Sequence, residues 1–254
     1  MKTMDLNADI GESYGAWCMG DDAAVVPHIS SANLACGFHA GDAQTMRRTI
    51  ALCLQHGVAI GAHPSLPDLQ GFGRREMKIS PDEVHAQTLY QVGALAAIAH
   101  AAGAKLRHVK PHGALYNMAA RDRALADAIA RAVRDFDDGL ILVGLAGSAS
   151  MAAARDAGLA CAPEAFCDRR YRADGTLTPR SQPGAVIDDI EQVIAQAIAI
   201  ATRNEAIADD GSRVRVTADT LCVHGDRVNA GEFARRLREA LEREGVRVVA
   251  PERA

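Results

Sequence analysis

The sequence predicts an α/β protein built around a closed barrel of parallel strands. Four times along the chain, an alanine-rich stretch of helical character is followed by a glycine and a short apolar run. The glycines at these junctions are well placed to end a helix in the left-handed conformation, and they are Gly57, Gly103, Gly158 and Gly245. Helix followed by strand, repeated along one chain, is typical of a parallel sheet.

The number of strands favours a barrel over an open sheet. Four further strand-like runs bring the total to seven or eight, and they are residues 4–10, 28–37, 140–147 and 217–226. Helices are expected between strands at residues 81–102, 121–135, 187–202 and 230–243. An open, doubly wound sheet remains the structural alternative, because hydrophobic periodicity carries no information on closure.

We expect a single domain over residues 1–254, because 48 % of the residues are apolar and no low-complexity linker interrupts the chain. One insertion is expected near residues 205–217. There an Asp-Gly pair lies between two short β-prone runs, which is typical of a β-hairpin.

Composition argues against several classes of function. The net charge is −4 with both signs interspersed, so the sequence predicts no binding of nucleic acid. No apolar run approaches the roughly 18 to 20 residues that span a bilayer, and we expect no membrane association. The six cysteines form no CxxC pair and follow no secretory signal. We therefore expect reduced thiols in a cytoplasmic protein that acts on a small molecule.

Polar side chains recur where the predicted strands end. In the first strand, Asp5, Asn7 and Asp9 alternate with apolar residues, so one face of that strand is wholly polar. In an α/β barrel, such residues at carboxyl ends of strands form the site. The candidate catalytic residues are Asp9, His39, His63, Lys110, His112, Glu164 and His224. The candidate substrate-binding residues are Asn7, Asn33, Arg74, Arg75, Arg180 and Asp226.

Each candidate also has a structural interpretation. A single histidine at a strand end is more often a hydrogen-bonded structural residue, and Asp42 could simply cap the following helix. The repetition along the chain favours a site. A metal site made by His39, His63, His112 and His224 with Asp9 stays open, because no compact motif such as HExxH is present to test it. The sequence also contains no GxxxxGK[ST] loop for a nucleotide.

Long segments of the chain closely resemble the LamB/YcsF family, the A subunits of prokaryotic 5-oxoprolinase. They are DLNADIGES, ANLACGFHAGD, GAHPSLPDLQGFGRR, VKPHGALYN, EAFCDRRYRADGTLTPR and ADTLCVHGD, in order from residue 5 to about residue 240. The resemblance implies a distorted seven-stranded (β/α) barrel similar to glycoside hydrolase and deacetylase folds. It also implies ATP-dependent hydrolysis of 5-oxo-L-proline to L-glutamate, with magnesium accompanying the nucleotide and with separate B and C subunits as partners.

The chemistry of that reaction suggests roles for the candidates. A lactam is a poor electrophile, so coupling to ATP suggests phosphorylation of its oxygen before water attacks. Lys110, the best placed, and the arginines Arg74, Arg75 and Arg180 suit the anionic groups. We favour His112, with Glu164 or Asp9 nearby, as the general base. Two alternatives remain: a stand-alone metal-dependent amidohydrolase or deacetylase, and a non-catalytic subunit that binds substrate or acts as a scaffold.

Overall fold

A computed structural model describes residues 2–179, 182–224 and 229–252. Its strands are β1 (Lys2–Ile10), β2 (Ser31–Ala35), β3 (Ala59–His63), β4 (Leu106–Val109), β5 (Ile141–Leu145), β6 (Ala160–Phe166), β7 (Glu205–Ile207), β8 (Arg213–Arg215), β9 (Thr220–His224) and β10 (Val246–Val248). Its helices are α1 (Asp22–Val25), α2 (Ala43–His56), α3 (Pro81–Ala101), α4 (Gly113–Arg121), α5 (Arg123–Phe136), α6 (Ala149–Asp156), α7 (Ile190–Arg203) and α8 (Ala230–Arg243), with the short 3-10 helix η1 (Val26–His28).

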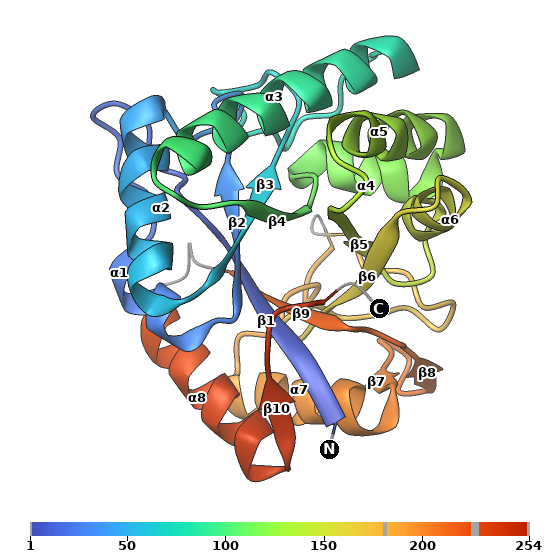
Figure 1. Ribbon diagram of the computed structural model, residues 1–254. Helices are drawn as coiled ribbons and strands as arrows, with labels where there is room; N and C mark the ends of the chain where they lie inside the picture. The colour runs from blue at the N-terminus through green and yellow to red at the C-terminus, as the bar shows by residue number, and fades with distance from the viewer. Residues whose placement is uncertain (1, 180–181, 225–228, 253–254) are drawn as a thin grey trace.

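Seven parallel strands close into a barrel, in the order β1-β2-β3-β4-β5-β6-β9, with β9 pairing back onto β1 (Figure 1). The closing register sets Asp5 opposite Thr220 and Ala8 opposite Val223. This closure rules out the open sheet that periodicity had left possible. The last strand, β10, pairs with residues Lys2 to Met4 of β1, before the segment that pairs with β9.

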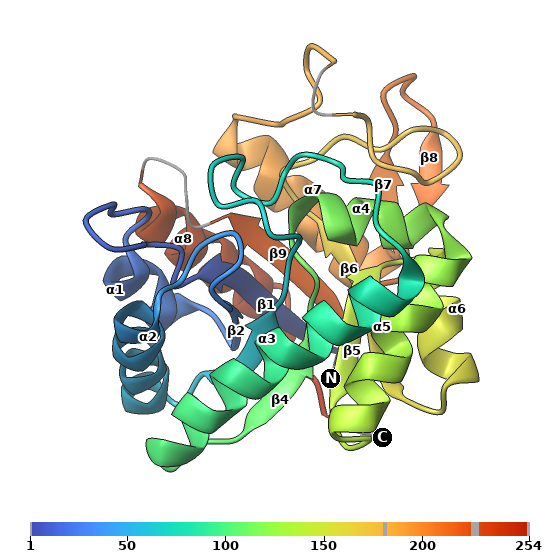
Figure 2. The same cartoon turned by 90° about the horizontal axis from the view of Figure 1, so that it is seen from above.

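Helices form the layer around the strands, as the view from above makes plain (Figure 2). The four junction glycines Gly57, Gly103, Gly158 and Gly245 all have positive φ, as predicted. The strands β7 and β8 pair antiparallel on either side of the Asp210-Gly211 turn and lie beside α7. None of the helices in the described residues is both long enough and apolar enough to cross a membrane.

The predicted start of the helix at residues 121–135 is wrong, because α5 begins at Arg123. Asp122 has extended backbone angles, and its side chain accepts hydrogen bonds from the amides of Ala124 and Leu125. It therefore caps α5, and a separate helix, α4, ends just before it. Before the break, α4 contacts β5, whereas after it α5 packs against the helices α3 and α6.

The two faces of β1 have opposite chemistry. Leu6, Ala8 and Ile10 point outward into the core between strands and helices, and each is at most 1 % exposed. Asp5 and Asn7 of the same strand are buried too, but inside the barrel. Asp5 accepts hydrogen bonds there from the hydroxyls of Ser30 (2.7 Å), Ser31 (2.8 Å) and Thr220 (2.5 Å). The barrel interior is therefore polar along β1 and its neighbours.

One glycine makes room for a buried histidine in this interior. A Cβ atom on Gly61 of β3 would lie 2.0 Å from Nε2 of His108 on β4. That ring nitrogen lies 2.7 Å from Oδ1 of Asn33, which places the imidazole across the barrel above β3. Position 61 accepts glycine because the ring occupies the space that any side chain would need.

Gly61→Ala is expected to lower the free energy of unfolding by about 3 kcal/mol, because the added methyl group must displace the His108 ring from a closed, well-packed interior. Chemical denaturation followed by circular dichroism measures this. Gly93→Ala in α3 is the matched control, because its Cβ would have no heavy atom within 4 Å and alanine favours helix. Equal stability of the two variants would contradict the packing argument.

A pH dependence of stability is expected from Asp5. Burial raises the pKa of its carboxyl from 3.8 to about 6, against the lowering effect of the hydroxyls. Ionisation therefore costs more in the folded chain than in the unfolded chain. Stability from this residue is complete below its unfolded pKa and is lost as the pH rises through about 6, with a total of about 3 kcal/mol.

Asp5→Asn removes that titration. The free energy of unfolding of the variant, relative to the natural chain, is expected to rise by about 3 kcal/mol between about pH 4 and about pH 8. Urea denaturation of both chains across this range measures the difference. Parallel pH profiles for the two chains would assign the dependence to other groups.

Candidate functional site

A buried lysine lies at the centre of the barrel interior. Lys110 directly follows β4, and its Nζ lies 2.9 Å from Oδ1 of Asp9 and 2.7 Å from Oε1 of Glu164. It also lies 3.1 Å from Oδ1 of Asn7 and 3.3 Å from Sγ of Cys222. The extended backbone before Pro111 directs the lysine stem across the barrel from β4 towards β1, β6 and β9.

Burial and charge act on this lysine in opposite directions. Burial disfavours the ammonium, but the carboxylates of Asp9 and Glu164 outweigh burial, so the pKa of Lys110 lies well above its ordinary value. Burial raises the pKa of Cys222 well above the usual thiol range, which keeps this neighbour a neutral thiol. Lys110 is therefore a fixed positive charge at neutral pH.

Asp9 connects the lysine to the mouth of the barrel. Its Oδ1 accepts hydrogen bonds from Lys110 and from Nδ2 of Asn33 (2.9 Å), and its Oδ2 lies 3.3 Å from Nε2 of His63. Burial alone would raise the pKa of Asp9, but His63 and Lys110 hold it well below its usual range. The side chain is 17 % exposed, compared with 0 % for Glu164. Asp9 is thus an ionised carboxylate with partial access to solvent.

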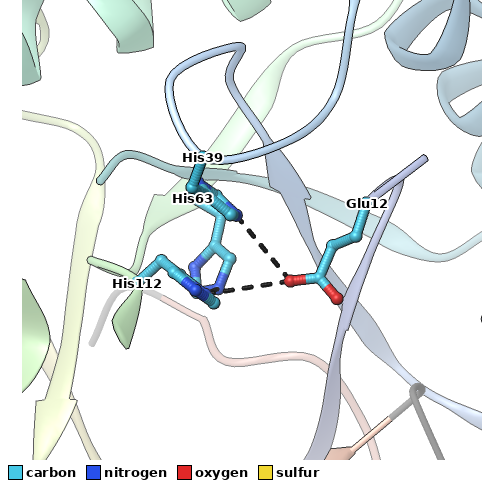
Figure 3. Close-up of side chains that lie close together, drawn as sticks. All are labelled: Glu12, His39, His63 and His112. Carbon is cyan, nitrogen blue, oxygen red and sulfur yellow. Dashed lines mark hydrogen bonds and ion pairs between the residues drawn. The ribbon is translucent and has the colours of Figure 1, made fainter. Parts of the chain in front are cut away.

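Three histidines and a glutamate meet at one point (Figure 3), and one of them, His63, lies beside Asp9. His63 ends β3, His39 lies in the loop after β2, His112 precedes α4, and Glu12 follows β1. One donor atom from each lies within 4.8 Å of every other. Oε1 of Glu12 is 3.7 Å from Nε2 of His39 and 3.8 Å from Nδ1 of His112. We call these four residues the histidine cluster.

The rings of the histidine cluster are held firmly. His39 and His112 stack with centroids 3.9 Å apart, and His63 meets His112 edge-on at 4.8 Å. Nδ1 of His63 lies 2.7 Å from the carbonyl oxygen of Lys110, and Nε2 of His112 lies 2.9 Å from that of Phe72. A carbonyl only accepts, so each of these nitrogens carries a proton.

The chemistry that follows is that of neutral imidazoles. Burial lowers the pKa of His112 to about 3, and burial with the neighbouring histidines lowers the pKa of His39 well below its usual value. Neutral imidazole is the form that coordinates metal ions. The contacts of His112 disfavour the general-base role that the sequence suggested for it, because its Nε2 donates to Phe72 and its Nδ1 lies 3.0 Å from Nε2 of His63.

A segment after β3, residues 64–80, covers the histidine cluster. The amide and carbonyl of Ser65 exchange hydrogen bonds of 2.9 Å with the side chain of Gln91 on α3. Gly73 has positive φ, and a Cβ there would lie 2.2 Å from Oγ of Ser65 and 2.9 Å from Cβ of His39. This segment therefore lies directly on the site and is fixed to a long helix.

The arginines of this segment differ in position. The guanidinium of Arg75 pairs with the carboxylate of Asp68, which also accepts the amide of Gly71, so Arg75 fixes the segment rather than facing Lys110. The guanidinium of Arg74 lies over the ring of Phe72, 4.9 Å from its centroid, and its charge reaches His39 and His112. Of the two, Arg74 is the one beside the site.

Most of the candidates from the sequence converge in one network. The structure brings together Asn7, Asp9, Asn33, His39, His63, Lys110, His112 and Glu164. Arg180, Asp226 and the side chain of His224 lie outside the described residues.

Sequence reasoning missed Glu12 and Cys222. Glu12 follows Gly11, whose φ is +67°, so it lies beyond the alternating pattern of β1 that identified Asp5, Asn7 and Asp9. The signal that could have found it is a glutamate in the turn directly after a polar strand. Cys222 alternates with Thr220 along β9, but a lone cysteine in a strand gives no sign of its neighbours.

Known proteins resemble this chain over nearly its whole length. The sequence profile of the LamB/YcsF family matches residues 4–254. A relative from Bordetella pertussis, named as the A subunit of 5-oxoprolinase, is 59 % identical over 97 % of this chain and 98 % of its own length. The crystal structure of a lactam utilization protein from Thermus thermophilus is 53 % identical, with a TM-score of 0.94 over 98 % of this chain and 100 % of that one.

A more distant likeness concerns the fold alone. The structure of T48 deacetylase with substrate is 13 % identical and has a TM-score of 0.50 over 98 % of this chain and 87 % of that one. The closed barrel that the resemblance implied is therefore a fold that this chain shares with a deacetylase. Because the family profile and the relative from Bordetella pertussis both match nearly its whole length, this chain belongs to the LamB/YcsF family.

Proposed function

We propose that this chain is the A subunit of an ATP-dependent 5-oxoprolinase, which hydrolyses 5-oxo-L-proline to L-glutamate in the cytoplasm while ATP becomes ADP and phosphate. Relatives with more than half of their residues identical are named as the A subunit of 5-oxoprolinase. The structural observation that supports the proposal most is the buried ammonium of Lys110, held by Asp9 and Glu164 beneath the mouth of the barrel.

The reaction needs a positive charge where an anion develops. Attack of water on the lactam carbon places negative charge on the lactam oxygen, and in the O-phosphorylated form that oxygen carries an anionic phosphate group. Lys110 is positive at neutral pH and is fixed by four polar neighbours, so it can stabilise that charge with little reorganisation. Arg74 lies beside the mouth and suits the carboxylate of 5-oxo-L-proline.

The reaction also needs a group that takes a proton from the attacking water. We assign this role to Asp9, because it is ionised and more exposed than Glu164. His112 is disfavoured because its Nε2 donates to the carbonyl of Phe72 and its Nδ1 lies 3.0 Å from Nε2 of His63, so both ring nitrogens already face a partner. Glu164 is fully buried behind Lys110, where it orients the lysine together with Asn7.

ATP and the partner subunits complete the proposal. The sequence contains no P-loop motif, so we propose that ATP with its magnesium binds through groups of another kind or through the B and C subunits. The six cysteines are free thiols, which fits a reducing compartment.

Lys110→Met is expected to lower turnover of the complete complex at least about 100-fold, the scale of losing a positioned catalytic charge. Methionine keeps much of the apolar stem, which limits the disturbance of packing. Glutamate release from 5-oxo-L-proline at saturating ATP measures the effect. Removing one partner of a buried ion pair can cost about 3 to 5 kcal/mol of stability. Circular dichroism of the variant therefore has to show that it folds.

The control for this variant is Lys105→Met, an exposed lysine just before β4. It is expected to leave turnover unchanged. A folded Lys110→Met chain that assembles with its partners and turns over at the natural rate would remove Lys110 from the mechanism. That result would favour a subunit that only binds substrate or acts as a scaffold.

Reconstitution tests the requirement for ATP and partners. We expect glutamate to form only when this chain, the B and C subunits and ATP are all present. The assay compares this chain alone with the mixture, each with and without ATP. Omission of any component should abolish the product, and product from this chain alone would contradict the proposed complex.

The histidine cluster favours one second candidate, a stand-alone metal-dependent amidohydrolase. Three imidazoles and a carboxylate at the carboxyl ends of the strands suit activation of water without ATP. Hydrolysis of 5-oxo-L-proline or another amide by this chain alone, without nucleotide, would select this candidate.

A further inference from the structure

We propose that the histidine cluster, His39, His63, His112 and Glu12, binds one divalent transition-metal ion of the zinc type. The inference goes beyond the proposed reaction, because binding of the ion by this chain requires neither the lactam nor ATP. It rests on the arrangement of donor atoms at the carboxyl ends of the first four strands.

The spacing of the donors suits a common ion. Bonds of about 2.0 to 2.1 Å in tetrahedral geometry place neighbouring ligand atoms roughly 3.3 Å apart. The observed separations begin at 3.0 Å, between Nδ1 of His112 and Nε2 of His63, and none exceeds 4.8 Å. Glu12 completes the set with Oε1 at 3.7 and 3.8 Å from two of the imidazoles. Four separate segments of the chain thus bring four donors to one point.

The hydrogen bonds of two rings leave their lone pairs facing each other. His63 donates its Nδ1 proton to the carbonyl of Lys110, and His112 donates its Nε2 proton to the carbonyl of Phe72. In the neutral rings, Nε2 of His63 and Nδ1 of His112 are then both acceptors, only 3.0 Å apart. Oδ2 of Asp9, a third acceptor, lies 3.3 Å from the same nitrogen of His63. Three acceptors at such short distances repel one another, and a cation bound between them would remove that repulsion.

A metal ion satisfies more of the cluster than a proton does. One extra proton on Nε2 of His63 would give His112 and Asp9 a donor to accept from. It would still leave the ring nitrogens of His39 without a partner among the described residues. His39 is 1 % exposed, and neither of its ring nitrogens has a hydrogen-bond partner within the described residues. Its Nε2 faces Glu12, and its ring stacks on His112. An ion at the cluster would engage His39 together with the other three residues.

The rings are also oriented as metal ligands usually are. A ligating histidine commonly donates its other N–H to a backbone carbonyl or carboxylate, which fixes both tautomer and ring orientation. His63 and His112 both do so here. The segment that supplies Phe72 is itself fixed through Ser65 to Gln91, so this outer support reaches as far as α3.

The donor set selects the class of ion. Imidazole nitrogen suits zinc, iron, cobalt, nickel and copper, whereas magnesium and calcium prefer oxygen ligands. Three imidazoles and one carboxylate therefore favour a transition ion over the magnesium that accompanies ATP. The two kinds of ion are distinguishable by experiment.

The test uses the full-length chain without an affinity tag, stripped with a chelator and dialysed against ZnCl₂, CoCl₂ or MgCl₂. Elemental analysis is expected to find about one zinc or cobalt ion per chain and no stoichiometric magnesium. At a free zinc concentration about 100-fold above Kd, the Tm is expected to rise by roughly 5 to 10 °C. The visible absorption of the cobalt form should carry the signature of nitrogen and oxygen ligands.

Two substitutions in the cluster, His39→Gln and Glu12→Gln, are each expected to weaken zinc binding at least about 10-fold. His108→Gln is the buried control, because His108 lies in the same barrel but bonds to Asn33 through Nε2. His100→Gln on the exposed face of α3 controls for surface binding. Both controls should retain one ion per chain.

Three results would overturn the proposal. The first is a natural chain that retains no transition ion and gains no Tm. The second is equal zinc affinity in the natural chain and the two cluster variants, and the third is a response to magnesium alone. These measurements need no substrate, so the two proposals can fail separately. An inactive complex with bound zinc would contradict the proposed reaction but not the metal site. An active complex without zinc would contradict the metal site but not the proposed reaction.

Discussion

The ion pairs of Lys110 determine how the barrel interior is built. Its ammonium reaches from the end of β4 across the barrel to Asp9 on β1 and Glu164 on β6. The two ion pairs therefore connect strands that are not neighbours in the closed sheet. Two buried carboxylates near a hydrophobic outer layer would be costly without it. The hydrogen bonds of Asn7 and Asn33 are arranged around the same carboxylates. The positions of these two asparagines therefore follow from this pairing.

Two aspartates on one strand show how strongly position controls charge. Asp5 and Asp9 both point into the barrel from β1, yet burial raises the pKa of the first to about 6, while His63 and Lys110 hold that of the second well below its usual range. The side-chain donors to Asp5 among the described residues are three hydroxyls, which lower its pKa less than burial raises it. The carboxylate suited to chemistry is therefore the one near the mouth, and the deeper one serves the packing of the interior.

Local patterns in the sequence predicted the barrel and much of the site. Alternation along β1 identified Asn7 and Asp9, and the Lys110-Pro111-His112 run identified the residues that end β4. Contacts made by irregular segments could not be predicted in this way. The pairing of Arg75 with Asp68 depends on the folded path of residues 64–80, and Glu12 joins the histidines only because the chain turns at Gly11. Periodicity describes strands and helices, whereas these contacts depend on tertiary geometry.

The closing of the barrel through β1 has a consequence for how the chain folds. The first strand pairs with β2 within the first 35 residues, but its other edge waits for β9, where Asp5 meets Thr220. During synthesis on the ribosome, the polar face of β1 therefore stays without its closing neighbour until almost the whole chain has emerged. Pairing over such a sequence separation slows folding. Until then the unpaired edge of β1 is open to pairing with other chains, so the incomplete barrel is prone to aggregation.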